Sequence, residues 1–232
     1  MQQTAPAINP KHLVHILAVS ASHFEERQNG FCQYTPEVGH VIIARRHELE
    51  KSNNFRQLLP GVVLTHKGRI FAYRRTPKGG EPGLHNQVAV LIGGHWDLSD
   101  IQLDKDGVID FERSLSTTIR REVTEEVLIH GQVINETLAP WVIAADETVV
   151  DEKHVALVSV LELSLAQVES KEDELEALGF FTADELLKSN LPLETWARLI
   201  CEKMRDGELP GAGSRQAYSL PDPVDSSFHA TK

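Results

Sequence analysis

The stretch "IRREVTEEVLI", residues 119–129, carries three glutamates and two arginines among evenly spaced apolar residues. On a helix each residue turns about 100°, so Glu122, Glu125 and Glu126 fit within an arc of about 100°. Their mutual repulsion is unfavourable unless water, an arginine or a cation relieves it. Arg121 stands four residues before Glu125 and can pair with it, which leaves the other carboxylates free. Hard divalent cations favour clustered oxygen ligands of this kind.

The residues around this stretch predict an amphipathic helix over residues 113–129. Its apolar positions recur every four residues, at Leu115, Ile119, Val123 and Val127. The apolar stripe adjoins the glutamates, which suits the wall of a cleft, whereas a solvated acidic face would lie opposite the core. An ordinary charged surface helix remains the alternative, because glutamate-rich amphipathic helices are common.

Apolar runs before the helix predict strands. "LLPGVVLTHKGRIFAYRRT" (58–76) is two such runs around a Lys-Gly turn, which is typical of a β-hairpin. "QVAVLI" (87–92) suits a buried strand and leads directly into Gly93-Gly94. "LVHILAVSA" (13–21) ends in small residues as a signal peptide does, but it is short and contains a histidine, so we favour a buried strand.

The chain after the helix continues the alternation of strands and helices. "HVALVSVLEL" (154–163) is a β-branched strand, and "ESKEDELEALGFF" (169–181) is an acidic loop that runs into a short strand. "TADELLKS" (182–189) begins like a capping box, and "LETWARLICEKMR" (193–205) is a last amphipathic helix. This order predicts a layered α/β (α+β) domain.

Three parts are expected along the chain. Residues 1–57 form an N-terminal extension packed on the main domain, and residues 58–205 form the main domain. Residues 206–232 are rich in Gly, Pro and Ser without periodicity, which predicts a flexible tail.

The composition limits the classes of partner. A formal net charge of −11 over 232 residues disfavours nucleic-acid polymers, because their binding relies on Lys and Arg neutralising phosphates. Cys32 and Cys201 are far apart and form no CxxC motif, so we expect neither a disulfide scaffold nor a zinc knuckle. We expect the protein in a reducing compartment, the cytoplasm. No apolar run approaches the roughly 18 residues of a membrane span. A homodimer remains open.

Around the helix the chain resembles the Nudix hydrolase family, whose motif reads G-x5-E-x7-R-E-U-x-E-E-x-G-U, with U apolar. Residues 121–129 match its second half at every position except one, where Leu128 replaces a glycine. The hairpin, the Gly93-Gly94 pair and "LEALGFFTADEL" (175–186) are also similar to the family, so the resemblance covers about residues 58–200. It implies an α/β/α sandwich with a mixed β-sheet, against which the motif helix packs.

The first half of the motif departs from the family. Counting back from Arg121, the first motif glutamate falls on Arg113, with Glu112 one place off, and the motif glycine falls on Gly107. We prefer Gly94 as that glycine, because it follows a strand while Gly107 stands in a polar turn. The loop between would then carry an insertion, as in a divergent subfamily of predicted phosphoesterases with an N-terminal extension.

The resemblance implies hydrolysis of a phosphoanhydride bond in a nucleoside diphosphate linked to another group. Such a substrate is polyanionic, and an acidic helix would repel it without Mg²⁺ or Mn²⁺. By resemblance, the metal ligands are Glu122, Glu125 and Glu126, with a backbone carbonyl of Gly93 or Gly94 completing the shell. One of these glutamates, or an acid elsewhere, would serve as general base.

Further candidates surround this set. By resemblance, Arg121 orients a glutamate through an ion pair, and the acidic loop offers Glu172 and Glu174 as a base or an extra ligand. Arg74 and Arg75 end a hairpin strand on opposite faces, so one of them can reach a phosphate.

The remaining substrate-binding candidates lie beside the glycine pair. His95 joins Gly93 in this set, although a lone histidine is more often structural. Tyr73 and Trp96 could stack on a base, although each is more often a packed aromatic.

A Nudix-fold module that binds nucleotides or regulates without catalysis is the competing interpretation. Leu128 and Arg113 favour it. The intact Arg-Glu and Glu-Glu pairs oppose it, because a module free of metal chemistry has no need to bear the clustered repulsion.

Overall fold

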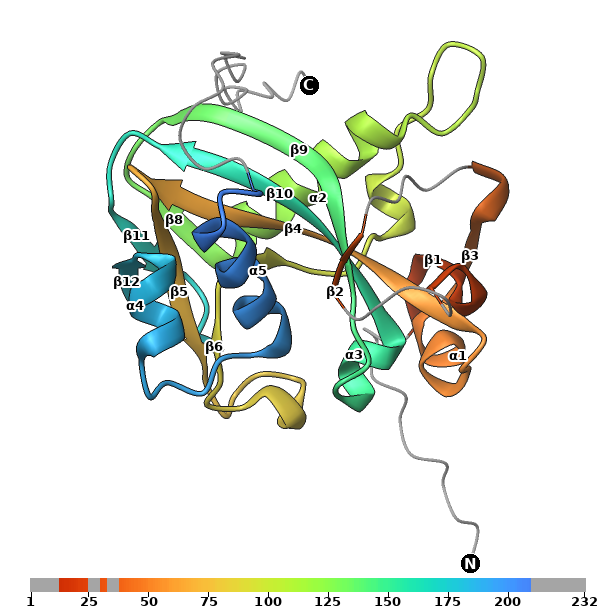
Figure 1. Ribbon diagram of the computed structural model, residues 1–232. Coiled ribbons are helices and arrows are strands. Elements are labelled where there is room, and N and C mark those ends of the chain that lie inside the picture. Colours follow the sequence, from red (N-terminus) through yellow and green to blue (C-terminus); the bar gives the residue numbers. More distant parts are fainter. Residues whose placement is uncertain (1–12, 25–29, 33–37, 210–232) are drawn as a thin grey trace, which may run out of the picture.

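The structure is a computed structural model that describes residues 13–24, 30–32 and 38–209 of the 232-residue chain (Figure 1). Most of the predicted tail, from residue 210 on, therefore lies outside the described residues. The strands are β1 His15–Ser20, β2 Gly30–Cys32, β3 Val41–Arg45, β4 Phe55–His66, β5 Arg69–Arg75, β6 Val88–Ala89, β7 Leu91–Gly93, β8 Val127–Ile129, β9 Val133–Ala144, β10 His154–Leu163, β11 Val168–Ser170 and β12 Leu175–Phe181. The α-helices are α1 Arg46–Lys51, α2 Phe111–Glu126, α3 Val149–Lys153, α4 Ala183–Lys188 and α5 Thr195–Arg205.

Ten of these strands form one mixed sheet, with the central order β12-β5-β4-β10-β9-β2. β4 and β10 pair in parallel over the register from His154↔Gln57 to Glu162↔Thr65. The neighbouring pairs β10–β9 and β12–β5 are antiparallel. β10 is buried along most of its length, which explains its continuous β-branched and apolar sequence.

The predicted hairpin is present, with Lys67 and Gly68 in the left-handed region at the turn. However, β4 and β5 pair only at Thr65↔Ile70 and His66↔Arg69 before they separate. The run "QVAVLI" fills the opening as two short strands rather than one, because β6 pairs with β5 while β7 pairs with β4.

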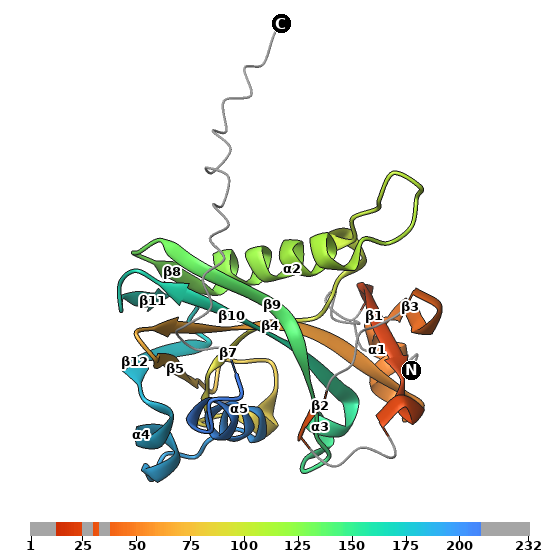
Figure 2. The same cartoon turned by 45° about the horizontal axis from the view of Figure 1, so that its top comes forward.

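Helices cover both faces of the sheet (Figure 2). Leu115 and Ile119 of α2 pack on one face against Leu58, Val62 and other buried residues of the sheet. α4 and α5 cover the other face through a second set of buried residues that includes Leu186, Ile200 and Cys201. The predicted α/β/α sandwich with a mixed sheet is thereby confirmed.

The motif helix α2 begins after Asp110, whose side chain accepts a hydrogen bond from the Arg113 N–H. It ends at Glu126, three residues earlier than the predicted end at Ile129. Val127 is already extended, because residues 127–129 pair as β8 with β11 instead of continuing the helix. Leu128, at the position of the motif glycine, is exposed in this short strand.

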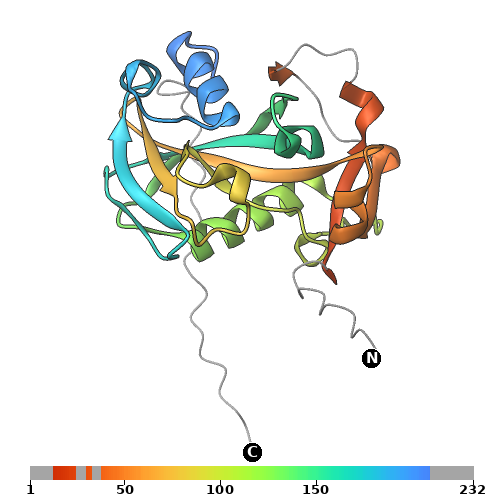
Figure 3. The ribbon, with the colours of Figure 1, turned by 90° about the horizontal axis from the view of Figure 1, so that it is seen from below.

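The described part of residues 1–57 joins the main sheet. β1 pairs with β3 and with the start of β4, and the Leu17 N–H donates to the Trp96 carbonyl at 2.9 Å. The expected boundary at residue 57 therefore falls inside β4. β1 and β3 lie at the opposite end of the sheet from α4 (Figure 3).

Within the described residues, no helix is long and apolar enough to cross a membrane. Tyr73 and Trp96, considered above as stacking partners, are each 1% exposed and belong to the core, so neither can stack on a ligand.

Candidate active site

A cavity of about 470 Å³ opens beside the C-terminal half of α2. Its walls come from α2, the Gly93-Gly94 segment, the loop after β5, the loop before β12, α3 and the start of α5. Ile16 of β1 and Arg46 of α1 also line it, so the N-terminal segment contributes to the wall.

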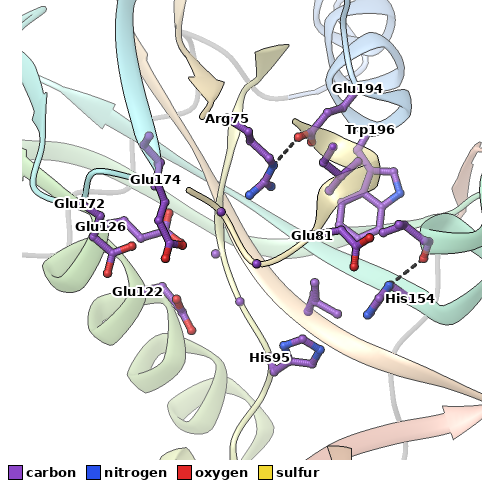
Figure 4. Close-up of a pocket in the computed structure, with 18 of the residues that line it drawn as sticks. Arg75, Glu81, His95, Glu122, Glu126, His154, Glu172, Glu174, Glu194 and Trp196 are labelled. Carbon is purple, nitrogen blue, oxygen red and sulfur yellow. Dashed lines mark hydrogen bonds and ion pairs between the residues drawn. The ribbon is translucent and has the colours of Figure 1, made fainter. Parts of the chain in front are cut away.

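Five glutamates gather on one side of this cavity. α2 supplies Glu122, Glu125 and Glu126, and the loop before β12 supplies Glu172 and Glu174. Figure 4 shows Glu122, Glu126, Glu172 and Glu174 together on that side. The structure thus brings the predicted helix acids and the predicted loop acids to one place.

Backbone hydrogen bonds hold the acidic loop beside α2. The Lys171 N–H donates to the Glu126 carbonyl at 2.9 Å, directly after the β8–β11 pairing. Farther along the loop, the Thr76 N–H donates to the Glu174 carbonyl at 2.8 Å. Because α2 ends at Glu126, residues 127–129 are free to form β8, which holds β11 and the following loop with Glu172 and Glu174 beside the helix.

Burial distinguishes the acids of α2. Glu122 is only 8% exposed, and desolvation raises its pKa to about 7. Burial, followed by the charge of Glu122, raises the pKa of Glu126 to about 8, and its buried Oε2 has no hydrogen-bond partner among the described residues. Glu125 is exposed. A carboxylate buried without a partner is unfavourable unless it is protonated or meets a cation.

Arg121 ties the helix to the loop before it. Its Nη2 donates to Asp100 Oδ2 at 2.8 Å and to the His95 carbonyl at 3.2 Å. Its Nη1 lies 2.7 Å from Glu122 Oε1 and 3.2 Å from Glu125 Oε2. Arg121 thus pairs with two of the glutamates, and the buried Asp100 steadies it. Sequence reasoning missed Asp100, because it is one of several acids in a polar loop.

The structure distinguishes the two candidate glycines. A Cβ atom added at Gly94 would lie 2.4 Å from Glu122 Oε1, so the backbone approaches this carboxylate as only glycine allows. Gly93 is equally confined, since its Cβ would lie 2.3 Å from the Pro60 carbonyl oxygen. Gly107 lies in an exposed turn, where no atom of the described residues comes within 4 Å of such a Cβ. The geometry favours Gly94 as the motif glycine.

Of the two hairpin arginines, only Arg75 lines the cavity. Arg74 faces the other way and pairs with Glu176 at 2.8 Å, so the structure does not bring it into the site. Arg75 forms a short ion pair with Glu194, which is 7% exposed. Sequence reasoning missed Glu194, although it opens the predicted last helix.

His154 and Trp196 line the side of the cavity opposite the glutamates of α2, with Glu81 beside them, and His95 lies between the two sides (Figure 4). The two imidazole rings meet edge to face with centroids 5.5 Å apart. Burial holds the pKa of each histidine below its usual value, so both are neutral at pH 7. Sequence reasoning missed His154 and Trp196, since each stands inside a strand or helix pattern that explains it without a ligand.

The acids do not form a ready-made metal site. Within the ranges that the structure describes, no three His, Cys, Asp or Glu side chains converge closely enough to hold an ion as they stand. One reason is that Arg121 already engages Glu122 and Glu125. The assignment of Glu122, Glu125, Glu126 and Gly94 as metal ligands therefore stays a prediction.

Comparison with known proteins places the chain in a family. No protein-family model matches it. Protein YmaB of Bacillus subtilis (strain 168) is 31% identical over 161 residues, which cover 68% of this chain and 75% of YmaB. The chain belongs to the YmaB family.

Solved structures identify the fold that this YmaB-family chain adopts. Tm1382, a protein proposed to be a Nudix hydrolase, superposes with a TM-score of 0.62 at 21% identity, covering 83% of this chain and 98% of Tm1382. The YmaB-family chain therefore has the Nudix fold. The NUDIX domain of Shewanella oneidensis NrtR, complexed with ADP ribose, is more distant, with a TM-score of 0.42 and 12% identity over 66% of this chain and 88% of that domain.

Proposed function

We propose that this YmaB-family chain is a divalent-metal-dependent hydrolase that cleaves a phosphoanhydride bond in a nucleoside diphosphate linked to another group. One observation carries the proposal: the buried Oε2 of Glu126, which has no hydrogen-bond partner in the described part of the chain, lies in a cavity where Glu122 is buried as well. Both acids have raised pKa values because of burial. A cation entering this cavity would relieve the cost of ionising them.

The donor set suits Mg²⁺ or Mn²⁺. Glu122, Glu125 and Glu126 offer carboxylate oxygens, and the Gly94 backbone approaches Glu122 closely. Hard divalent cations take oxygen ligands of this type, often with several waters. When bound, such an ion offsets phosphate charge and lowers the pKa of its water. We assign these four residues as the metal-holding set.

The other residues of the site bind and orient. Arg75 faces the cavity and its ion pair with Glu194 fixes the guanidinium, so we assign it to a substrate phosphate. Arg121 orients Glu122 and Glu125 through its ion pairs. Glu174 lies beside the acids of α2 but comes from the loop before β12. We assign it as the general base that accepts a proton from the attacking water.

A small molecule remains the proposed partner. The net charge of −11 disfavours a nucleic-acid polymer, and the cytoplasm remains the proposed compartment.

A metal-supplemented activity screen tests the proposal. The purified chain is incubated with dNTPs, NADH, ADP-ribose, dinucleoside polyphosphates and nucleotide sugars, with Mg²⁺, Mn²⁺ or EDTA. We expect release of phosphate or a nucleoside monophosphate from at least one class, abolished by EDTA. Turnover of no substrate, together with no metal binding, contradicts the proposal and returns the chain to the class of noncatalytic modules.

A further inference from the structure

The cavity has a second half that the proposed hydrolysis does not use. It lies opposite the glutamates of α2 and carries Trp196 and His154, with Glu81 beside them and His95 between the two halves (Figure 4). The cavity is also lined by three partly buried apolar side chains, Leu59, Leu84 and Val150. One enclosed space thus has a half that gathers five glutamates and a half that gathers aromatic and apolar side chains beside the carboxylate of Glu81.

The hydrogen bond of His154 fixes what this residue can recognise. Its Nδ1 lies 2.7 Å from the Val150 carbonyl oxygen, which can only accept, so Nδ1 carries the proton. The neutral ring is left with Nε2 as an acceptor. His154 therefore suits a ligand group that donates a hydrogen bond, not a phosphate.

Two buried polar atoms of the cavity lining lack partners in the part of the chain that the structure describes. Neither His95 Nε2 nor Trp196 Nε1 has a hydrogen-bond partner among the described residues. Buried polar groups of this kind are normally satisfied, so an orphaned pair beside one cavity points to a group that enters it. Two cations of the cavity lining, Arg46 and Arg121, lie near enough to act on His95, and both are already paired. Arg46 pairs with Glu50 at 2.8 Å and Arg121 with Asp100 at 2.8 Å.

We propose that Trp196, His154 and His95 form the subsite of an uncharged, planar ring that carries an amino group, such as the base of an adenine or cytosine nucleotide. The indole of Trp196 offers a stacking surface, and His154 accepts the hydrogen bond of the amino group. The assignment rests on the proposed hydrolysis, since it makes this ring the nucleoside end of the substrate. The diphosphate then extends toward Arg75 and the glutamates.

Binding of free nucleosides tests the subsite without turnover. The full chain is titrated with adenosine in EDTA by ligand-observed NMR, and Trp196→Leu is compared with Trp141→Leu. Trp141 packs against Phe31 and does not line the cavity, so it controls for loss of a half-buried indole. We expect Trp196→Leu to weaken adenosine binding about tenfold or more, and Trp141→Leu to leave it unchanged.

A second comparison tests the amino group. Purine riboside is adenosine without its amino group, and we expect the wild type to bind it about three- to tenfold more weakly. In His154→Phe this preference disappears. His66→Phe is the matched control, because His66 Nδ1 makes a similar 2.8 Å bond to the Leu163 carbonyl away from the cavity, and it keeps the preference.

The outcomes separate this subsite from the hydrolysis. If the chain hydrolyses a nucleotide substrate but binds neither nucleoside, the subsite alone is overturned. The same holds if Trp196→Leu binds adenosine as tightly as the wild type. An adenosine preference that persists in His154→Phe overturns the role of the amino group. Adenosine binding that depends on Trp196, in a chain that hydrolyses nothing, supports the ring subsite while overturning the hydrolytic function.

Discussion

Glu126 has one carboxylate oxygen that is buried without a partner in the described structure, and burial raises its pKa to about 8. At the scale of single residues, the glutamates of α2 differ mainly in this respect. The sequence predicts that Glu122, Glu125 and Glu126 share one side of a helix, and they do. It could not predict which of them are buried, because that depends on the sheet and on the loop before β12.

The buried acid gives a prediction for stability against pH. Burial raises the pKa of Glu126 in the folded chain to about 8, above its ordinary value of 4.5, so between these two pH values the folded chain holds a proton that the unfolded chain releases. Its contribution to stability is full below pH 4.5 and is lost as the pH rises through 8. Without metal, we expect the wild type to lose on the order of 2 kcal/mol of unfolding free energy over this window.

The variant Glu126→Gln should lose clearly less unfolding free energy over the same pH range, since glutamine cannot ionise. Urea unfolding in EDTA at several pH values measures this. Glu176→Gln is the control, because Glu176 is exposed and paired with Arg74, and it should follow the wild type. An equal pH dependence in Glu126→Gln and wild type contradicts the assigned burial.

The two glycines give a second prediction at this scale. A methyl group at Gly94 would meet the Glu122 carboxylate at 2.4 Å, so Gly94→Ala must displace that side chain. We expect the hydrolytic rate to fall at least tenfold while the fold is kept. Gly107 has a φ of +78° and open space around it, so Gly107→Ala should cost about 1 kcal/mol of stability and leave the rate unchanged. The reverse pattern of rates would make Gly107 the motif glycine.

At the scale of elements, local patterns predicted most of the secondary structure. The hairpin, β10, α4 with its capping box and α5 all follow from apolar periodicity and turn residues. Two elements did not. α2 stops at Glu126 and "QVAVLI" divides into β6 and β7, because in both cases a distant strand supplies the competing backbone partner.

The same limit applies to the loop between Gly94 and α2. Nothing in its sequence singles out Asp100, yet Asp100 is 4% exposed and holds Arg121 in place. Its partner lies 21 residues along the chain, on the helix. Only the folded arrangement reveals that this loop supports the motif arginine.

This ion pair gives a prediction for the element. Asp100→Asn leaves the Arg121 guanidinium without its buried countercharge, so we expect a loss of about 2 kcal/mol of stability, together with a lower hydrolytic rate. Chemical denaturation and rate measurements check both. The control is Asp104→Asn in the same loop, because Asp104 accepts turn hydrogen bonds that asparagine can also accept. If the two variants are equally stable, Asp100 does not anchor the helix.

At the scale of the whole molecule, the described N-terminal strands belong to the main sheet. Ile16, Leu17, Ala18 and Val19 of β1 are fully buried, and β1 pairs with the start of β4. The sequence predicted an extension packed on the domain, but not that it would also line the cavity through Ile16 and Arg46. That role depends on long-range pairing, which local periodicity does not encode.

Truncation tests this integration. A chain that begins at Asn53 lacks β1 and exposes the first residues of one edge of β4, so we expect it to aggregate or to unfold without cooperativity. Circular dichroism and gel filtration show the result. As a milder change, Leu17→Ala should cost about 2–4 kcal/mol, while Leu13→Ala, at an exposed position, should cost little. A truncated chain that unfolds as cooperatively as the full chain contradicts this description.

The central claim is that the acids of α2 form a metal-dependent hydrolytic site. The most direct test measures product release from the best nucleotide substrate by wild type, Glu125→Gln and Glu126→Gln, each with Mg²⁺ and with EDTA. We predict Mg²⁺-dependent turnover by wild type, a loss of two or more orders of magnitude in both variants, unchanged circular dichroism, and wild-type rates for Glu176→Gln. Full Mg²⁺-dependent activity in both α2 variants would contradict the claim.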